Sequence, residues 1–467
     1  MTVTRRAGTR ARPLRPGREP AGRDAIPGPP LRTLPVLISK LWRDRLALLS
    51  DATAEFGDAV RLSMGPKTLY YFNHPDHAKH VLADNAGNYH KGMGLSQAKR
   101  ILGDGLLTSE GEQWRRQRRT ISPAFRRDRL ARFAGLITAE IGTLAGRLDA
   151  QAGAGPVDVT AEMTRFTLRV LGTALLDADL SPFGDLGGAF DVAQDQAMFE
   201  MVTLGAVPLW LPLPRNRRFR TARRHLEDAV YTLAAERELG GGPGGDDVLS
   251  LVLADGHGEP SPGRRRRMLR DEMITILLAG HETTASTLSW TWYLLGRHPE
   301  VAERVAAEAA DVLGDREPGG GDLPRLQYTT MVIQEVMRLY PPVWGLPRKA
   351  LGTDSIGGYQ VPAGADVMIS PYTLHRHPGF WPAPGRFDPE RFGPAAAGQA
   401  HRYAYIPFGA GPRVCVGSHL GMMEAVFAVA MVARRFRLSL PPGHQVVPEA
   451  NLSLRVRGGL PVRVTRV

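Results

Sequence analysis

The sequence predicts a single large domain that is mainly α-helical and carries a few small β-sheets. Apolar residues recur at helical spacing over most of the chain between residues 113 and 339, which is typical of amphipathic helices. The β-rich runs lie near both ends of the chain and do not alternate with the helices, which argues against a doubly wound sheet. With 467 residues, of which 43% are hydrophobic, the chain can form a large core, although length alone also allows two or three smaller domains.

The first elements follow an arginine-rich tail. Residues 1–25 hold seven arginines among prolines and glycines, so we expect a disordered basic tail there and an ordered domain over residues 26–467. A Pro-rich entry, "IPGPP", leads to a helical stretch around residues 36–56. In "DAVRLSMGPKTLYYFNHP", two β-rich runs meet at a Gly-Pro pair, which predicts a hairpin.

Helical spacing then predicts a series of helices, over residues 113–150, 160–175, 189–205, 217–237, 270–295, 299–313 and 328–339. Glycine-rich segments at 240–247 and 319–322 are predicted to be surface loops. The run of four arginines at 264–267 is predicted to be a solvated face just before a helix. A second strand pair is predicted within "GGYQVPAGADVMIS", with its turn at Pro362-Ala363-Gly364.

The net charge of +12 could indicate a nucleic-acid partner, but the arginines of the tail account for much of the excess. We therefore predict no nucleic-acid partner. No run of about 18 apolar residues occurs, and the N-terminus lacks the apolar stretch of a signal peptide. The expectation is a cytoplasmic monomer without a membrane span.

The only cysteine, Cys415, lies in "YIPFGAGPRVCVGSHLG". It cannot form an internal disulfide or a cysteine-based structural zinc site. Phe408, Gly411, Arg413 and Gly417 complete the pattern F-x-x-G-x-R-x-C-x-G. Backbone N–H groups and a nearby cation lower the pKa of a thiol, and glycines let the backbone approach a flat group, as a sulfur that ligates haem iron requires. A buried structural cysteine is the usual alternative, but this pattern arises by chance on the order of once in several thousand chains or less often.

This loop resembles the signature loop of the cytochrome P450 family, the haem-thiolate monooxygenases, and the resemblance extends from about Pro27 to the C-terminus. It implies the cytochrome P450 fold and a haem b cofactor whose iron is ligated by Cys415. In this family Phe408 would shield the sulfur.

In "ILLAGHETTASTLSW", the residues Ala279, Gly280, Glu282, Thr283 and Thr284 match the family pattern A-G-x-E-T-T. Reduction of dioxygen needs protons, and an acid next to an alcohol can deliver them, so Glu282 and Thr283 are the predicted catalytic residues. A threonine pair in a helix more often bonds back to the preceding turn. The zinc motif H-E-x-x-H is incomplete here, because its fifth position is not histidine.

Other motifs follow in the order of the family. Glu335 and Arg338 form E-x-x-R, and Arg391 follows in "FDPERF"; by resemblance the three brace the cysteine loop as a buried ion network. Loss of one partner would leave an uncompensated charge and prevent haem incorporation.

The two haem propionates require cations and donors. The resemblance assigns them to Trp114, Arg118, Arg348 and Arg413, with a looser match for His90 and Lys91. Trp114 and Arg118 are one helical turn apart. The neighbouring arginines of "WRRQR" would give a basic face for an acidic electron-transfer protein.

The chain has no nucleotide fingerprint and no room for a flavin domain. Similar bacterial proteins receive electrons from a ferredoxin, which a ferredoxin reductase recharges from NAD(P)H, and the same partners are expected here. The segments expected over the haem are mainly apolar, with Met198, Phe199, Met201, Leu204, Leu277, Val343 and Trp344.

An apolar pocket indicates a neutral, lipophilic substrate. We expect O₂-dependent hydroxylation of a cyclic terpene or terpene alcohol in a bacterial secondary-metabolite pathway, such as that of an antibiotic. A fatty acid or a polyketide is the second candidate. A peroxide-driven or isomerising haem-thiolate enzyme and a haem sensor without turnover remain as other classes.

Overall fold

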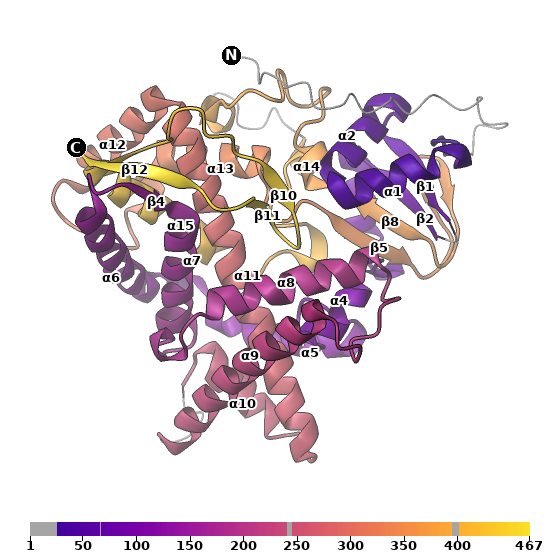
Figure 1. The fold of residues 1–467 in the computed structure, drawn as a ribbon, viewed down its shortest axis with the longest axis horizontal. Coiled ribbons are helices and arrows are strands. Elements are labelled where there is room, and N and C mark those ends of the chain that lie inside the picture. Colours follow the sequence, from indigo (N-terminus) through magenta and orange to yellow (C-terminus); the bar gives the residue numbers. More distant parts are fainter. Residues whose placement is uncertain (1–25, 66, 241–244, 395–400) are drawn as a thin grey trace.

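The computed structural model describes residues 26–65, 67–240, 245–394 and 401–467. The predicted basic tail and part of the loop predicted at 240–247 lie outside these residues. Figure 1 shows a mainly helical molecule with small sheets, as predicted.

The helices take up most of the described chain. Their bounds are α1 Leu34–Arg43, α2 Arg45–Phe56, α3 Pro75–Lys79, α4 Leu95–Leu102, α5 Gly111–Ile121, α6 Arg127–Gln151, α7 Val159–Val170, α8 Leu186–Val202, α9 Pro214–Leu239, α10 Val248–Gly256, α11 Pro262–Arg297, α12 Pro299–Leu313, α13 Gln327–Leu339, α14 Pro371–Leu374 and α15 Ser418–Arg435.

The strands form one larger sheet and three small ones. They are β1 Ala59–Met64, β2 Lys67–Phe72, β3 Tyr89–Lys91, β4 Pro156–Asp158, β5 Leu346–Ala350, β6 Asp354–Ile356, β7 Tyr359–Val361, β8 Asp366–Ile369, β9 Phe436–Ser439, β10 Pro448–Ala450, β11 Leu454–Val456 and β12 Pro461–Arg466. The five-stranded sheet has the order β1-β2-β8-β5-β3, in which β2 and β8 are parallel and the other pairs antiparallel.

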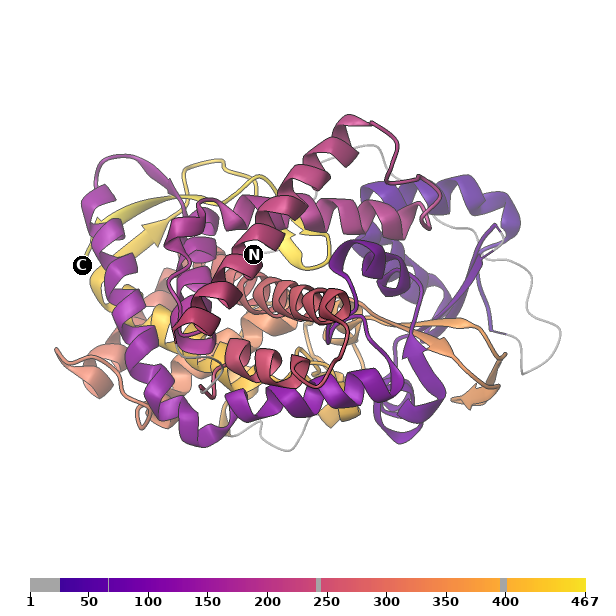
Figure 2. The ribbon, with the colours of Figure 1, turned by 90° about the horizontal axis from the view of Figure 1, so that it is seen from below.

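The long helix α11 runs through the middle of the molecule (Figures 1 and 2). It packs against α7, α9, α13 and α15. Its C-terminal half is anchored by Trp290, whose ring stacks on Tyr340 at 3.9 Å and whose indole N–H donates to the carbonyl of Leu454. The five-stranded sheet, with α1 and α2 beside it, lies at one end of the molecule. The position of α11 is therefore fixed on several sides, which makes it a rigid wall for a site.

The helices differ from the predicted ranges in several places. The helix predicted over residues 113–150 is two helices, α5 and α6, because a short turn that contains Pro123 separates them. The short helices α3, α4 and α14 lie outside every predicted range. The predicted helix at 36–56 is two helices, because Asp44 caps the second by accepting a hydrogen bond from the N–H of Ala47 at 2.9 Å. Helix α10 was not predicted. The arginines at 264–267 lie within the first turns of α11 and not before it, because Pro262 starts the helix and arginine is a good helix former.

The hairpin of β1 and β2 agrees with the prediction, but the second predicted strand pair is wrong. Strand β7 pairs with β6, whereas β8 pairs with β2 and β5 in a different sheet. The tight turn lies at Gly357-Gly358, where both residues have positive φ, a conformation that glycine adopts without strain. The segment at 362–364 connects two sheets.

None of the helices in the described part of the chain combines the length and the apolar character that a membrane span requires.

Candidate active site

A cavity of about 410 Å³ lies between α11 and the cysteine loop. Its wall also includes parts of α5, α8, α13, β5 and the loop before β11. All eight residues predicted for catalysis or cofactor binding line this one cavity: Trp114, Arg118, Glu282, Thr283, Arg348, Phe408, Arg413 and Cys415. The tertiary structure thus brings together motifs that are far apart in the sequence.

Cys415 lies in the wall of the cavity, in the loop before α15. Its backbone N–H donates to the carbonyl of Phe408 at 2.9 Å, which closes the loop. Burial raises the pKa of the Cys415 thiol, while the N–H of Gly417 and the charge of Arg118 act in the opposite direction. The protein thus places a donor and a cation beside the sulfur, as expected for a thiolate ligand, and a metal cation bound there would favour the anionic form further.

The two glycines of the loop have different roles. Gly411 has φ +68°, and a Cβ there would lie 1.9 Å from the carbonyl oxygen of Leu82. Glycine is therefore needed at this position because the loop packs directly against the backbone of the protein. At Gly417 the nearest atom to an added Cβ belongs to Phe125, at 3.5 Å. The contacts within the protein therefore explain Gly411, whereas Gly417 leaves room on the cavity side.

Helix α11 places Glu282 and Thr283 in the cavity wall. The hydroxyl of Thr283 donates to the carbonyl of Ala279 at 2.8 Å, which is the ordinary back-bond of a helical threonine. Glu282 accepts a hydrogen bond of 2.5 Å from the hydroxyl of Ser453. Gly280 is explained by packing, because a Cβ there would lie 2.6 Å from the side chain of Leu171.

His281, to which the sequence assigned no role, is buried. Its Nδ1 lies 2.7 Å from the carbonyl of Leu277, and its ring packs against Phe190. Burial lowers the pKa of His281, although Glu282 lies 3.9 Å away. A neutral ring bound to the carbonyl donates through Nδ1 and belongs to the core.

Three cations line the cavity without a carboxylate partner. Among the described residues, neither Arg118, Arg348 nor Lys91 forms an ion pair. Arg348 is only 8% exposed and donates to the carbonyl of Pro347. Burial, reinforced by Arg413, lowers the pKa of Arg348 to about 10 and that of Lys91 to about 7.

Buried cations without counter-ions are costly. Their presence beside the cysteine fits a cofactor that carries carboxylates, so the residues of the cavity fit haem with its two propionates. Lys91 and His90 were both only loosely matched from the sequence; Lys91 lines the cavity, whereas His90 does not.

Arg413 is held differently. It forms an ion pair with Glu110, and its guanidinium carbon lies 4.5 Å from the centre of the Trp114 ring. The stacking and the ion pair orient both side chains at the cavity. Glu110 was not predicted, since a single acid before a helix has no distinguishing pattern.

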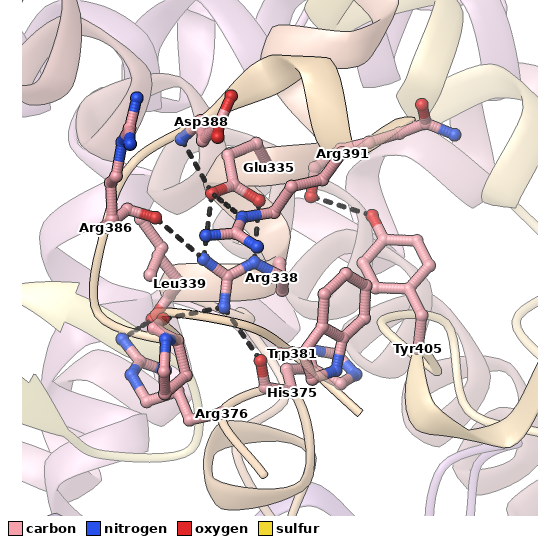
Figure 3. Close-up of polar contacts among 12 residues, drawn as sticks. Glu335, Arg338, Leu339, His375, Arg376, Trp381, Arg386, Asp388, Arg391 and Tyr405 are labelled. Atoms are coloured by element: carbon pink, nitrogen blue, oxygen red, sulfur yellow. Dashed lines mark hydrogen bonds and ion pairs between the residues drawn. The ribbon is translucent and has the colours of Figure 1, made fainter. Parts of the chain in front are cut away.

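Figure 3 shows the predicted ion network of Glu335, Arg338 and Arg391. Glu335 and Arg338 form two hydrogen bonds, of 2.6 and 2.8 Å, and both side chains are fully buried. Arg391 lies 3.6 Å from the same carboxylate. Arg338 also donates to the carbonyl of His375 at 2.9 Å, and Nε2 of His375 accepts from the N–H of Ile406 at 2.8 Å.

His375 thereby joins the network to the segment that leads into the cysteine loop. Burial, together with the charge of Arg338, lowers the pKa of His375 to about 3, so the ring is neutral and can accept through Nε2. No motif in the sequence singles out this histidine.

The pocket prediction was right only in part. Met201, Val343 and Trp344 line the cavity, but four of the predicted residues do not: Met198, Phe199, Leu204 and Leu277. Phe199 packs against Trp42 and Arg215, and Leu204 is exposed. Apolar side chains at helical spacing do not by themselves distinguish pocket from core. Ser453 also lines the cavity, within the segment 451–454 that the resemblance places over the haem, whereas Gln194 lines it without having been predicted.

Comparison with known proteins agrees with this geometry. A family model described as cytochrome P450 matches residues 27–463. The chain is 37% identical to cyclooctatin synthase of Streptomyces melanosporofaciens, over 88% of this chain and 89% of that protein. It is 35% identical to cyclooctat-9-en-7-ol 5-monooxygenase of the same organism, over 86% of this chain and 87% of that protein. It is 31% identical to pentalenene oxygenase of Streptomyces avermitilis, over 88% of this chain and 90% of that protein. With its cysteine loop, acid-alcohol pair and unpaired cations around one cavity, the chain belongs to the cytochrome P450 family of haem-thiolate monooxygenases, in which Cys415 is the ligand of the haem iron.

Proposed function

We propose that this protein hydroxylates a cyclic terpenoid in a bacterial secondary-metabolite pathway, such as that of an antibiotic, using O₂ and electrons from a ferredoxin. The observation that carries the proposal is a cavity that joins the iron ligand to a largely apolar wall. Leu106, Leu171, Ile276, Val343 and Trp344 belong to this wall. Such a wall binds a lipophilic molecule mainly through burial of apolar surface, at about 25 cal/mol per Å².

The names of the relatives support the same substrate class. Two of the three are monooxygenases or oxygenases of named cyclic compounds, cyclooctat-9-en-7-ol and pentalenene, and the third is a synthase of cyclooctatin. We carry the class, a cyclic terpenoid, over to this chain, and not the individual compounds.

Haem supplies the activation of dioxygen when it is bound. The residues of this chain have separate tasks around it. Cys415 holds the iron, and Arg118, Arg348 and Lys91 neutralise the propionates. Phe408 would cover the sulfur, and Trp114 and Arg413, which stack on each other at the cavity, would also bind the propionates. Glu282 and Thr283 would hold and transfer protons at the α11 wall of the cavity, where Ser453 orients the Glu282 carboxylate.

The electron donor we propose is a ferredoxin, recharged from NAD(P)H in the cytoplasm by a ferredoxin reductase. Support comes from α5, which carries Arg118 toward Cys415 and presents Arg115, Arg116 and Arg119 at the surface. Arg116 is paired with Asp255, and Arg115 with Glu112. The remaining positive charge can attract an acidic protein to the cysteine side.

The test uses the haem-loaded protein with a ferredoxin, its reductase and NADPH. A panel of cyclic terpenes and terpene alcohols should yield products with one added oxygen atom. The reduced protein should show the thiolate band when treated with carbon monoxide, and Cys415→Ser should lose both the band and the products. Preferred oxidation of fatty acids or polyketides would overturn the terpenoid assignment. Turnover with hydrogen peroxide alone would favour the peroxide-driven class.

A further inference from the structure

Helix α8 places a fully buried amide in the wall of the cavity. Gln194 has no exposed surface, and it lines the cavity on the same face of α8 as Met201, seven residues later. Neither its Nε2 nor its Oε1 has a hydrogen-bond partner. A buried amide without partners is costly, and most buried polar side chains in folded proteins are paired.

The other polar groups around the cavity are largely accounted for. Glu282 accepts from Ser453, Lys91 donates to two backbone carbonyls, and Asn451 donates to Asp195. These groups therefore have partners within the protein, whereas Gln194 has none.

Two further residues of the described cavity wall carry unpartnered polar atoms, Thr275 and Glu424. The hydroxyl of Thr275 lies against the backbone of Gly105, where an added Cβ would be 2.2 Å away. Glu424 belongs to α15, which follows the cysteine loop directly, and burial raises the pKa of its carboxyl well above the usual range. Gln194 is therefore the one residue of the described cavity wall whose whole amide lacks a partner, and it lies on α8, a helix separate from the cysteine loop.

We propose that the Gln194 amide binds an oxygen atom already present on the substrate, so that the preferred substrate is a terpene alcohol or ketone and not a terpene hydrocarbon. This inference rests on the proposed function. An alcohol can accept from Nε2 or donate to Oε1, and a ketone can accept from Nε2. A hydrocarbon leaves both amide atoms unpaired when it displaces water from them.

The assignment also gives the enzyme a place in a reaction sequence. The substrate must come from a step that has already installed oxygen, either a cyclisation ended by capture of water or an earlier hydroxylation; a ketone requires in addition the two-electron oxidation of that alcohol by a dehydrogenase or an oxygenase. This enzyme then adds a further oxygen at a carbon that the Gln194 contact directs toward the haem.

A matched pair of ligands tests the proposal. Cedrol is a cyclic terpene alcohol, and cedrane is the saturated hydrocarbon of the same skeleton. Their dissociation constants are measured on the holoenzyme from the shift of the Soret band. The ratio of the cedrane constant to the cedrol constant should fall about tenfold in Gln194→Met, because methionine has a similar shape but no amide; tenfold corresponds to about 1.4 kcal/mol.

Gln196→Met is the matched control. Gln196 lies on the same helix and is equally buried, but its amide is 3.4 Å from Asn216 and does not line the cavity. This variant should keep the wild-type ratio. Gln194→Leu provides a second test if the methionine variant loses haem.

The outcomes separate this inference from the proposed function. If both ligands bind but their ratio is unchanged in Gln194→Met and Gln194→Leu, the role of Gln194 is wrong and the terpenoid assignment stands. If neither ligand nor any other cyclic terpenoid shifts the Soret band of the wild-type protein, the proposed function fails, and this inference fails with it.

Discussion

The hydroxyl of Ser453 donates a hydrogen bond of 2.5 Å to the carboxylate of Glu282, across 171 residues of sequence. The bond joins the loop before β11 to the middle of α11 and fixes one oxygen of the predicted proton carrier. The strand that follows this loop is also bonded to α11, since the hydroxyl of Ser286 and the indole of Trp290 both donate to the carbonyl of Leu454, the first residue of β11. Glu282 is thus held by a segment that has its own anchors on the same helix.

We expect Ser453→Ala to uncouple electron consumption from product formation. A hydrogen bond to a charged group contributes roughly 1.5–3 kcal/mol, and without it the carboxylate is free to leave its position beside Thr283. Product formed per NADPH should fall severalfold while substrate binding changes little, and Ser453→Thr should restore the yield. The exposed Ser439 provides the control, Ser439→Ala. Unchanged coupling in Ser453→Ala would show that this contact does not serve proton transfer.

Substitution of Arg338 should destabilise the protein more than substitution of a surface arginine. Arg338→Leu leaves Glu335 buried without its partner, at a cost of about 3–5 kcal/mol. The holoprotein should therefore form with much less haem, measured as the ratio of Soret to protein absorbance. Arg304 also pairs with a carboxylate, Glu390, at 2.7 Å, but both are more than half exposed. Arg304→Leu should change stability by no more than about 1 kcal/mol. Similar haem content in the two variants would contradict this account.

The glycines at 411 and 421 should respond differently to alanine. Gly411→Ala meets the carbonyl of Leu82 and requires a left-handed backbone from a residue with a side chain. The variant should bind haem weakly and unfold at a lower temperature. At Gly421 an added Cβ would meet only the hydroxyl of Thr284, at 3.6 Å, so Gly421→Ala should keep wild-type stability. Thermal unfolding of the two variants checks this, and equal melting temperatures would exclude a packing role for Gly411.

Glu272 should make stability depend on pH. Burial raises the pKa of Glu272 from 4.5 to about 8, whereas the N–H of Leu106 partly offsets this effect. Between these pH values the unfolded chain binds fewer protons than the folded one, so the contribution of Glu272 to the free energy of unfolding falls as the pH rises.

Glutamine does not ionise, so the free energy of unfolding of Glu272→Gln should rise relative to that of the wild type as the pH rises. The rise should be roughly 3 kcal/mol between pH 5 and pH 8. Urea unfolding at the two pH values measures the difference. Glu112→Gln, at an 80% exposed side chain, should show no such gain. If the difference in the free energy of unfolding between Glu272→Gln and the wild type does not change with pH, the Glu272 carboxyl of the wild type ionises normally in the folded protein.

Local chemistry explains why several features could be predicted from the sequence. The cysteine loop, the acid-alcohol pair and E-x-x-R each require fixed residue types within one turn or one helix. The spacing of these residues can therefore be recognised directly in the sequence. The helical spacing of apolar residues likewise predicted a mainly helical fold, since one face of each helix must be buried. The five predicted site residues of the cysteine loop and the acid-alcohol pair line the cavity, and so do Trp114, Arg118 and Arg348, which were assigned by the resemblance to the family.

The pairing of elements was decided only by the tertiary structure. Strand β8 joins β2 and β5 and not its neighbour β7, because strand pairing depends on which edges packing brings together. Ser453 reaches Glu282, and Arg413 reaches Glu110, across long stretches of sequence. Gln194 faces the cavity, whereas Gln196, two residues later on the same helix, bonds to Asn216. The sequence determined which chemistry the chain carries, and the packing of its helices determined which side chains surround that chemistry, because the face that a helix presents depends on its neighbours.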